Sequence, residues 1–255
     1  MNSYCNFLKV AVQAVELART VIVDQYYHGF KIEYKKDGSP VTSADVLAEQ
    51  IIRSHILKHF PDHIFYGEEG GQSGRKAKYS WIVDPIDGTV NYIRKIGLFA
   101  TEVALMEENE FVVGVSDAPI MNELITATKN NGAFCNGKQI HVSEINKFDD
   151  SYVNFGSLNG FFDNNKIESL HSLLKGKHGT RGIGGAYGYH LLAQGKIDIM
   201  VEARLKIWDI AAQAVIIQEA GGAISDMNGK PLTLKTDSCI ASNRKLHTKA
   251  LSFFK

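Results

Sequence analysis

Apolar side chains recur at helical spacing in the first part of the chain. From about Ser3 to Tyr26 they form one stripe, and charged or amide side chains occupy the other face. The stripe consists of Phe7, Val10, Ala11, Ala14, Leu17, Ala18, Val21 and Ile22. A second helix is predicted from about Ser43 to Phe60, ending before Pro61. The first sixty residues are therefore predicted to hold two helices.

After Pro61 the period of the pattern changes from helical to short apolar or alternating runs separated by turn residues. These runs lie near Ile64 to Tyr66, Trp81 to Val83, Thr101 to Met106, Val112 to Ser116 and Leu124 to Thr128. Asn131-Gly132 and Asn136-Gly137 are typical of hairpin or loop turns. This part of the chain is predicted to form a sheet.

In the second half, helices and strands alternate. A helix is predicted around Ala186 to Gln194, a strand over Ile197 to Glu202, and a strongly apolar helix over Asp209 to Ala220, closed by two glycines. The alternation predicts an α/β or α+β fold built in layers. The polar stretch Glu144 to Asp150 is the best candidate for a boundary between two halves, residues 1–146 and 147–255, of a single domain.

Composition narrows the class of protein. The chain has 255 residues, 44% of them hydrophobic and 22% charged, which is ordinary for a globular enzyme. Its 28 basic and 28 acidic residues cancel, which disfavours nucleic acid as the main ligand. Three scattered cysteines without a CxxC pair indicate a reducing compartment. Because charged residues interrupt the first apolar stretch and no run approaches 18 apolar residues, we expect a cytoplasmic protein without membrane contact.

The stretch WIVDPIDGTVNYI places Asp84 and Asp87 three residues apart, directly after the apolar run Trp81 to Val83. Pro85, Asp87 and Gly88 can form a turn without any ligand. However, a buried strand ending here would bring both carboxylates to the rim of a sheet, where binding crevices are common. Two crowded carboxylates repel each other unless a cation lies between them, and oxygen ligands without cysteine or histidine suit Mg²⁺ better than Zn²⁺.

Three further stretches carry acidic residues in similar settings: SPVTSAD with Asp45, YGEEGG with Glu68 and Glu69, and IWDIAA with Asp209. Each has a purely structural explanation, since Thr42 and Asp45 fit a capping box, the two glutamates fit a solvated loop, and Asp209 fits a helix cap. Taken together, these explanations are weaker. Asp209 lies between a tryptophan and an apolar helix, where an unpaired carboxylate is costly.

GEE, WIVDPIDGTVNY and WDIAAQAVIIQEAGG, in this order and spacing, resemble the signatures of the inositol monophosphatase family of Mg²⁺-dependent, lithium-sensitive phosphomonoesterases. The resemblance covers nearly the whole chain. It implies a layered αβαβα sandwich of the inositol monophosphatase and fructose-1,6-bisphosphatase type. It also implies a homodimer that acts on a small phosphate ester with two or three bound Mg²⁺ ions.

The resemblance further implies a set of metal ligands. Glu68, Asp84 and the backbone carbonyl of Ile86 would bind one Mg²⁺, and Asp84, Asp87 and Asp209 a second; a third, weaker ion is expected near Glu68. Ions in these places would neutralise the phosphate and make a bound water acidic enough to attack phosphorus.

Other residues would act on water and phosphate. By the same resemblance, Thr89 hydrogen-bonds to Asp45 and helps to orient and deprotonate the attacking water, so that Asp45, Glu68 and Thr89 form the catalytic set. Gly88 and Thr89 would present backbone N–H groups to the phosphate at the start of a helix. No covalent enzyme intermediate is implied.

The segment Arg181 to Glu202 corresponds to the substrate-recognition part of the family, which implies substrate contacts from Gly184, Gly185, Ala186 and Glu202. Its GG, YGY, LLA and VE elements resemble the histidinol-phosphatase branch. That branch usually has an acidic residue and a cysteine between the glycines and YGY, whereas this chain has only Ala186.

Two other stretches divide the substrate prediction. Lys36 to Asp45 is similar to histidinol-phosphate and phosphoadenosine phosphatases, and Thr89 to Tyr92 is closer to inositol phosphatases. We favour a small polyol phosphate such as inositol 1-phosphate. The alternatives are histidinol phosphate, phosphoadenosine phosphate or fructose bisphosphate as substrate, and a regulatory scaffold that retains the fold.

Some other features have a structural explanation that we prefer. His55 and His59 have the spacing of two metal ligands on one helix face but lack a third ligand. Gly182 to Gly188 does not match a dinucleotide loop, because the preceding KGKHGT is a poor strand and Tyr187 replaces the last glycine. The pattern does not decide whether Phe161 and Phe162 are buried or exposed.

Overall fold

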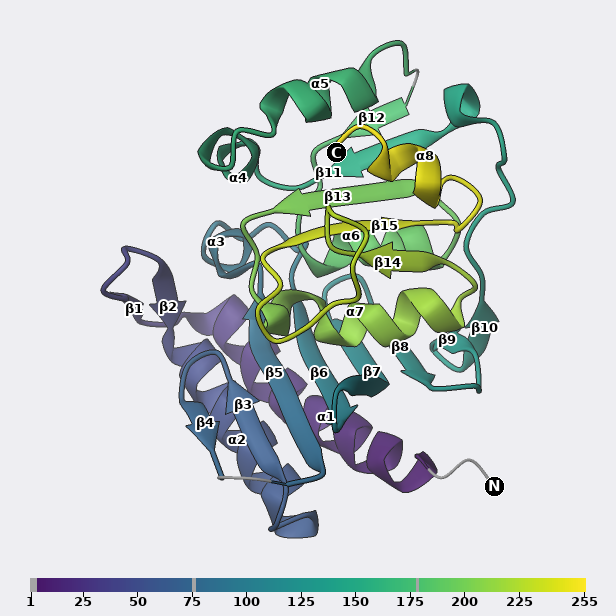
Figure 1. Cartoon of the computed structure of the whole chain (residues 1–255). Coiled ribbons are helices and arrows are strands. Elements are labelled where there is room, and N and C mark those ends of the chain that lie inside the picture. Colours follow the sequence, from purple (N-terminus) through teal and green to yellow (C-terminus); the bar gives the residue numbers. More distant parts are fainter. Residues whose placement is uncertain (1–3, 75–76, 178) are drawn as a thin grey trace.

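The computed structural model describes residues 4–74, 77–177 and 179–255. Two long helices, α1 (Cys5–His28) and α2 (Ser43–His59), lie side by side on one face of a sheet (Figure 1). Both were predicted, with ends that differ by one or two residues; the predicted first residue, Ser3, lies outside the described residues. The apolar stripe of α1 faces the sheet, because its members Val10, Ala11, Ala14, Ala18 and Ile22 are buried.

The sheet beneath these helices has eight strands in the order β10-β9-β8-β7-β6-β5-β3-β4. They are β3 (Ile64–Gly67), β4 (Gly71–Ser73), β5 (Tyr79–Asp87), β6 (Ala100–Glu107), β7 (Glu110–Ala118), β8 (Glu123–Thr128), β9 (Ala133–Cys135) and β10 (Lys138–Ile140). All neighbours are antiparallel except β3 and β5, which are parallel. A two-residue turn at Asn136-Gly137, with both φ angles positive, joins β9 to β10 as predicted.

Strand β5 is longer than the sequence predicted. The apolar run Trp81 to Val83 was expected to end before the aspartates, and this is wrong, because the strand continues through Asp87. Its pairing with β6 shifts between Asp84 and Asp87, and an irregularity of this kind accommodates Pro85, which cannot donate to the ladder. Asp84 and Asp87 therefore lie on a bulged strand end rather than on a free turn.

Helices α6 (Ala186–Ala193) and α7 (Ile207–Glu219) cover the other face of this sheet. Helix α7 is buried on nearly all sides, which explains its uniformly apolar sequence. It begins two residues earlier than predicted, so Asp209 is the third residue of the helix, where its side chain caps the helix start by accepting the backbone N–H of Lys206. The core around α6 and α7 takes residues from both halves of the chain, including Ile82 and Ile210.

A second sheet of five strands packs on the far side of α6 and α7, in the order β12-β11-β13-β15-β14. These strands are β11 (Tyr152–Phe155), β12 (Gly179–Arg181), β13 (Ile199–Ala203), β14 (Ala223–Ser225) and β15 (Ser238–Ser242). Helices α4 (Leu158–Asp163), α5 (Ile167–Leu174) and α8 (His247–Leu251) form the outermost layer. Figure 1 shows the resulting αβαβα sandwich.

Four small elements remain, and one of them is the short helix α3 (Thr89–Ile93), which follows β5. Strands β1 (Ile32–Tyr34) and β2 (Pro40–Thr42) form a hairpin before α2, and the 3-10 helix η1 (Phe148–Asp150) precedes β11. The predicted boundary, Glu144 to Asp150, lies on the connection from β10 in the first sheet to β11 in the second. The division into two halves stays a prediction. Among the described helices, none is long and apolar enough to cross a bilayer.

Candidate active site

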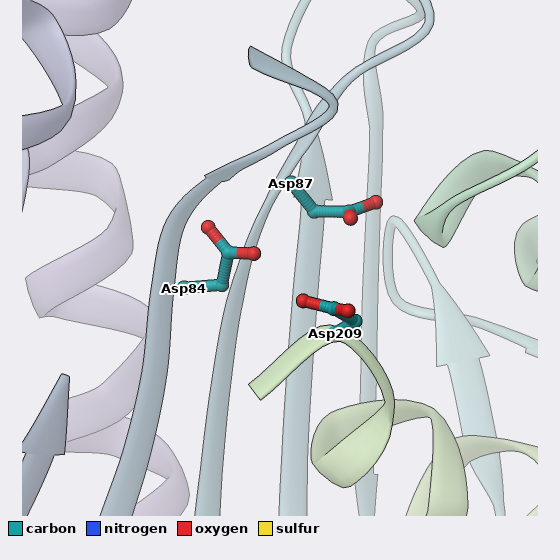
Figure 2. Close-up of side chains that lie close together, drawn as sticks. All are labelled: Asp84, Asp87 and Asp209. Carbon is teal, nitrogen blue, oxygen red and sulfur yellow. The ribbon is translucent and has the colours of Figure 1, made fainter. Parts of the chain in front are cut away.

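Three aspartates from two distant parts of the chain meet between the eight-stranded sheet and α7. Asp84 and Asp87 come from the bulged end of β5, and Asp209 comes from the first turn of α7. The carboxylates of Asp84 and Asp209 point toward each other, and that of Asp87 lies beside them (Figure 2). One oxygen from each lies within 4.8 Å of the others. Backbone N–H groups hold each carboxylate: Ile86 N donates to Asp84 at 3.0 Å, and Lys206 N donates to Asp209 at 2.7 Å.

Burial and mutual repulsion make the charged form of this cluster costly. Burial, followed by the charges of Glu68, Asp87 and Asp209, raises the pKa of Asp84 well above its usual value. Burial and the charge of Asp87 likewise raise the pKa of Asp209. Burial raises the pKa of Asp87 to about 7, although a hydrogen bond from Ala186 N–H opposes the shift. A cation bound among these carboxylates would therefore stabilise their ionised forms.

The donor set suits Mg²⁺. Its members are carboxylate oxygens, which are hard ligands, and the described cluster contains neither cysteine nor histidine. A divalent cation between the three carboxylates would remove the repulsion that raises their pKa values. The residues present at this site therefore fit the metal that the sequence pattern indicates.

Glu68 lies in the turn between β3 and β4 and lines the same cavity as Asp87 and Asp209. Lys35, in the loop of the β1–β2 hairpin, donates to Glu68 Oε1 and Glu69 Oε1, both at 2.8 Å. The explanation of these glutamates as solvated loop charges is therefore wrong. Burial raises the pKa of Glu69 to about 7. The contact of Lys35 with Glu68 was not predicted from the sequence.

Asp45 lies at the start of α2 and forms the predicted capping box with Thr42, whose backbone N–H donates to Asp45 Oδ2 at 2.8 Å. The other carboxylate oxygen faces Thr89. The hydroxyl of Thr89, at the start of α3 (Thr89–Ile93), lies 3.3 Å from Asp45 Oδ1 and 3.1 Å from the carbonyl oxygen of Ile86. The structure thus brings Asp45 and Thr89 together, two of the three residues that the resemblance links to the attacking water.

A cavity of about 630 Å³ opens beside these residues. Its walls include most of the predicted site residues, namely Glu68, Asp87, Gly88, Thr89, Gly184, Gly185, Glu202 and Asp209. Asp45, Asp84, Ile86 and Ala186 do not line it; they are buried behind its wall. The cavity is large enough for a small phosphate ester.

The segment before α6 contacts both the aspartate cluster and Glu202. Ala186 N donates to Asp87 Oδ2 at 2.5 Å, and Gly185 N donates to Glu202 Oε1 at 2.9 Å. A side chain at residue 185 would place its Cβ 2.6 Å from Asp87 Oδ2, and the φ of +72° also favours glycine. Gly185 therefore allows the segment predicted to recognise substrate to lie directly against Asp87.

The features that we did not assign to the site lie elsewhere. The rings of His55 and His59 are 4.6 Å apart on α2, and His59 Nδ1 is 2.9 Å from the carbonyl oxygen of His55. Phe161 is fully buried, whereas Phe162 is 57% exposed. KGKHGT was judged a poor strand, but Gly179 to Arg181 form β12, because pairing with β11 decides the conformation of this short segment.

Two buried glutamates near the site were not predicted from the sequence. Glu49 follows Asp45 by one helical turn on the buried face of α2, and an acidic residue on an apolar stripe was a signal that could have indicated it. Glu102 lies opposite Asp84 on β6 and accepts hydrogen bonds from Ser116 and Gln213. No local pattern distinguishes Glu102 from an outward-facing strand residue.

The sandwich fold with an acidic cluster beside a cavity is the arrangement expected of a metal-dependent α/β hydrolase. The sequence profile of the inositol monophosphatase family matches residues 4–254. The chain belongs to the inositol monophosphatase family and is a phosphomonoesterase. The family is generally Mg²⁺-dependent, and sensitivity to lithium is typical of it.

Its relatives carry different names. The chain is 33% identical to a histidinol-phosphatase of Streptomyces coelicolor, over 99% of this chain and 98% of the relative. It is 34% identical to an inositol-1-monophosphatase of Mesorhizobium japonicum, over 97% and 96% of the two chains. The extragenic suppressor protein suhB of Bartonella henselae superposes with a TM-score of 0.91 at 30% identity, covering 98% of each chain. The first two names both describe phosphatases but differ on the substrate, and the third names no substrate.

Proposed function

We propose that this protein hydrolyses a small polyol-type phosphate, such as inositol 1-phosphate, by direct attack of water with Mg²⁺ as cofactor. The observation that supports this most strongly is the convergence of Asp84, Asp87 and Asp209 beside a cavity that Gly88 and Thr89 also line. A cluster of carboxylates next to a phosphate-sized cavity is the arrangement that metal-assisted phosphoryl transfer requires.

Glu68, Asp84 and the carbonyl of Ile86 would hold one cation, and Asp84, Asp87 and Asp209 a second. A third, weaker ion would bind near Glu68 after displacing the ammonium group of Lys35. When bound, the cations supply charge neutralisation for the phosphate and lower the pKa of water. The backbone N–H contacts to Asp84, Asp87 and Asp209 would keep the carboxylates in place while the ester binds.

Thr89 and Asp45 would prepare the water for attack. With its hydrogen directed to Asp45, the Thr89 hydroxyl oxygen is free to accept a hydrogen bond from water, which orients a water lone pair toward phosphorus. The new P–O bond then forms opposite the ester oxygen as the ester P–O bond breaks. The proton lost by water would pass toward Asp45, the leaving alkoxide would take a proton from a solvent water, and alcohol and phosphate would be released.

Glu202 is the residue that we assign to the alcohol part of the substrate. It lines the cavity, and burial raises the pKa of its carboxyl group. One oxygen accepts the N–H of Gly185, which leaves acceptor capacity for a substrate hydroxyl. Gly184, Gly185 and Ala186 would shape this end of the cavity. These contacts suit a neutral polyol.

Histidinol phosphate is the second candidate, because the similarity to the Streptomyces coelicolor histidinol-phosphatase spans nearly the whole of both chains. A cationic amino alcohol would also be attracted to the carboxylates of the cavity wall. Phosphoadenosine phosphate and fructose bisphosphate stay as further alternatives. A purely regulatory role would leave the complete set of carboxylates without a purpose.

A phosphate-release assay over these three esters and inositol 1-phosphate separates the candidates. With Mg²⁺ present, we expect the highest kcat/KM for the inositol ester, because Glu202 offers an acceptor and Ala186 offers no second acidic group. Turnover should vanish with EDTA and decrease with Li⁺. A higher kcat/KM for histidinol phosphate would replace the polyol assignment while leaving the reaction unchanged. A homodimer and a cytoplasmic location stay predictions.

A further inference from the structure

Helix α2 carries two buried carboxylates on the same face, one turn apart. Asp45 contacts Thr89 and belongs to the site described above. Glu49 does not line the cavity and has no part in the proposed reaction, although it is only 3% exposed. A carboxylate buried this deeply is costly unless specific groups satisfy it, so its contacts indicate its role.

The carboxylate of Glu49 binds the backbone of the turn that carries Glu68. Glu69 N donates to Glu49 Oε2 at 2.7 Å, and Gly70 N donates to Glu49 Oε1 at 2.9 Å. On its other side, Glu68 N donates to the carbonyl oxygen of Val83 on β5 at 3.1 Å. The backbone of the turn is thus held between α2 and β5. The residue that it contacts on β5, Val83, directly precedes Asp84 in the sequence.

Arg53 completes this arrangement. Its Nη2 donates to Glu49 Oε1 at 3.0 Å and to the carbonyl oxygen of Gly71 at 3.1 Å, and its guanidinium lies 4.5 Å from the centre of the Phe65 ring. Glu49 is therefore neutralised by a partner on its own helix, and both groups hold the backbone between residues 69 and 71. We call these two side chains the Glu49–Arg53 pair.

The turn is shaped to receive this pair. A Cβ at residue 70 would lie 2.6 Å from Glu49 Oε1 and 2.7 Å from Arg53 Nη2, which is too close for both side chains to stay in place. Because Gly70 lacks a side chain, the carboxylate reaches the backbone N–H groups directly. A glutamate that was merely exposed to solvent would not need to approach the backbone of the turn this closely.

Holding the turn matters because Glu68 faces like charges. Asp45, Asp84 and Asp209 all lie near enough for the charge of Glu68 to disfavour their ionised forms. Without a cation, this repulsion disfavours a Glu68 carboxylate near the cluster. The ion pair with Lys35 opposes it at the side chain, and the hydrogen bonds of the turn hold the backbone. The Glu49–Arg53 pair acts on that backbone.

We propose that Glu49 is a positioning residue for the metal site, which fixes the turn from Glu68 to Gly71 so that the Glu68 carboxylate faces the aspartate cluster before a cation arrives. This inference rests on the proposed function, which assigns Glu68 as a metal ligand. Residues that orient metal ligands from outside typically contribute about 10–100-fold to metal affinity.

The test is calorimetric titration of the substrate-free protein with Mg²⁺, comparing wild type with Glu49→Gln. We expect Mg²⁺ to bind about 10–100-fold more weakly to the variant, because the amide keeps only one acceptor oxygen and loses the charge that pairs with Arg53. At saturating Mg²⁺, kcat should stay within about threefold of wild type, since Glu49 contacts neither water nor ester. Hydrogen exchange of the metal-free variant should be faster at residues 69 and 70.

Gly70→Ala provides a second variant that leaves Glu49 intact. Its Cβ displaces the Glu49 carboxylate, so the loss of Mg²⁺ affinity should be in the same direction. Glu168→Gln, on the exposed face of α5, removes the same charge far from the site and should bind Mg²⁺ like wild type. Glu68→Gln removes the assigned ligand itself and serves as the reference for loss of the cation site to which Glu68 belongs.

The four variants distinguish the positioning role of Glu49 from the assignment of Glu68 as a metal ligand. If Glu68→Gln weakens Mg²⁺ binding but Glu49→Gln and Gly70→Ala bind Mg²⁺ normally, the positioning role is overturned and the proposed function stands. A lower melting temperature with unchanged Mg²⁺ affinity would make Glu49 a structural residue only. If Glu68→Gln itself binds Mg²⁺ normally, the ligand assignment within the proposed function fails, and the role of Glu49 fails with it.

Discussion

The Asp84→Asn variant is expected to lose at least about 10³-fold in kcat/KM while its metal-free form becomes more stable than metal-free wild type. Asp84 is assigned to both principal cations, so its loss removes several kcal/mol of transition-state stabilisation. In the absence of metal, the same substitution removes one of three clustered carboxylates that repel one another. The asparagine oxygen can still accept the N–H of Ile86, which preserves the bulged strand end.

Phosphate release at saturating Mg²⁺ and the melting temperature in EDTA measure the two effects. Asp62→Asn is the matched control, because Asp62 is exposed in the turn between α2 and β3 and the same substitution there should change neither quantity. Loss of activity together with a lower melting temperature in EDTA would point to damaged folding instead of a missing ligand. Retained activity would remove Asp84 from the metal site and refute the proposed mechanism.

The parts of this fold that the sequence predicted are those with a strong local period. Helices α1 and α2 each bury one stripe, and α7 is apolar almost throughout. These helices can therefore be recognised from the sequence without knowing what packs against them. The five-stranded sheet was largely missed, because β11, β12, β14 and β15 are three to five residues long. Pairing and packing, rather than local propensity, decide the conformation of such short runs.

The site shows the same division. Asp84, Asp87 and Asp209 could be predicted because carboxylates beside long apolar runs are unusual, and the structure brings them together. Lys35 and Glu102 could not be predicted, because each depends on a partner that folding brings from another strand or loop. The end of β5 was predicted too early, since proline normally interrupts a strand and the bulge that admits it has no local signal.

Removal of Mg²⁺ is expected to destabilise the protein more at about pH 8 than at about pH 5. Asp84, Asp87 and Asp209 have raised pKa values in the folded protein, that of Asp87 reaching about 7. Between the pKa of an unfolded aspartate, about 3.9, and the folded value, the folded state binds more protons than the unfolded state. The free energy of unfolding of the metal-free protein therefore falls as the pH rises through this window.

Mg²⁺ reverses this loss because it neutralises the carboxylates that protons neutralise at low pH. The rise in melting temperature on adding Mg²⁺ should therefore be several degrees larger at about pH 8 than at about pH 5, given that 1 kcal/mol shifts the melting temperature by about 2–4 °C in a protein of this size. Thermal unfolding with EDTA and with Mg²⁺ at both pH values measures it. The Asp84→Asn variant should show a weaker pH dependence in EDTA, since fewer carboxylates titrate. An equal Mg²⁺-induced rise at both pH values would mean that the cation binds away from the aspartate cluster.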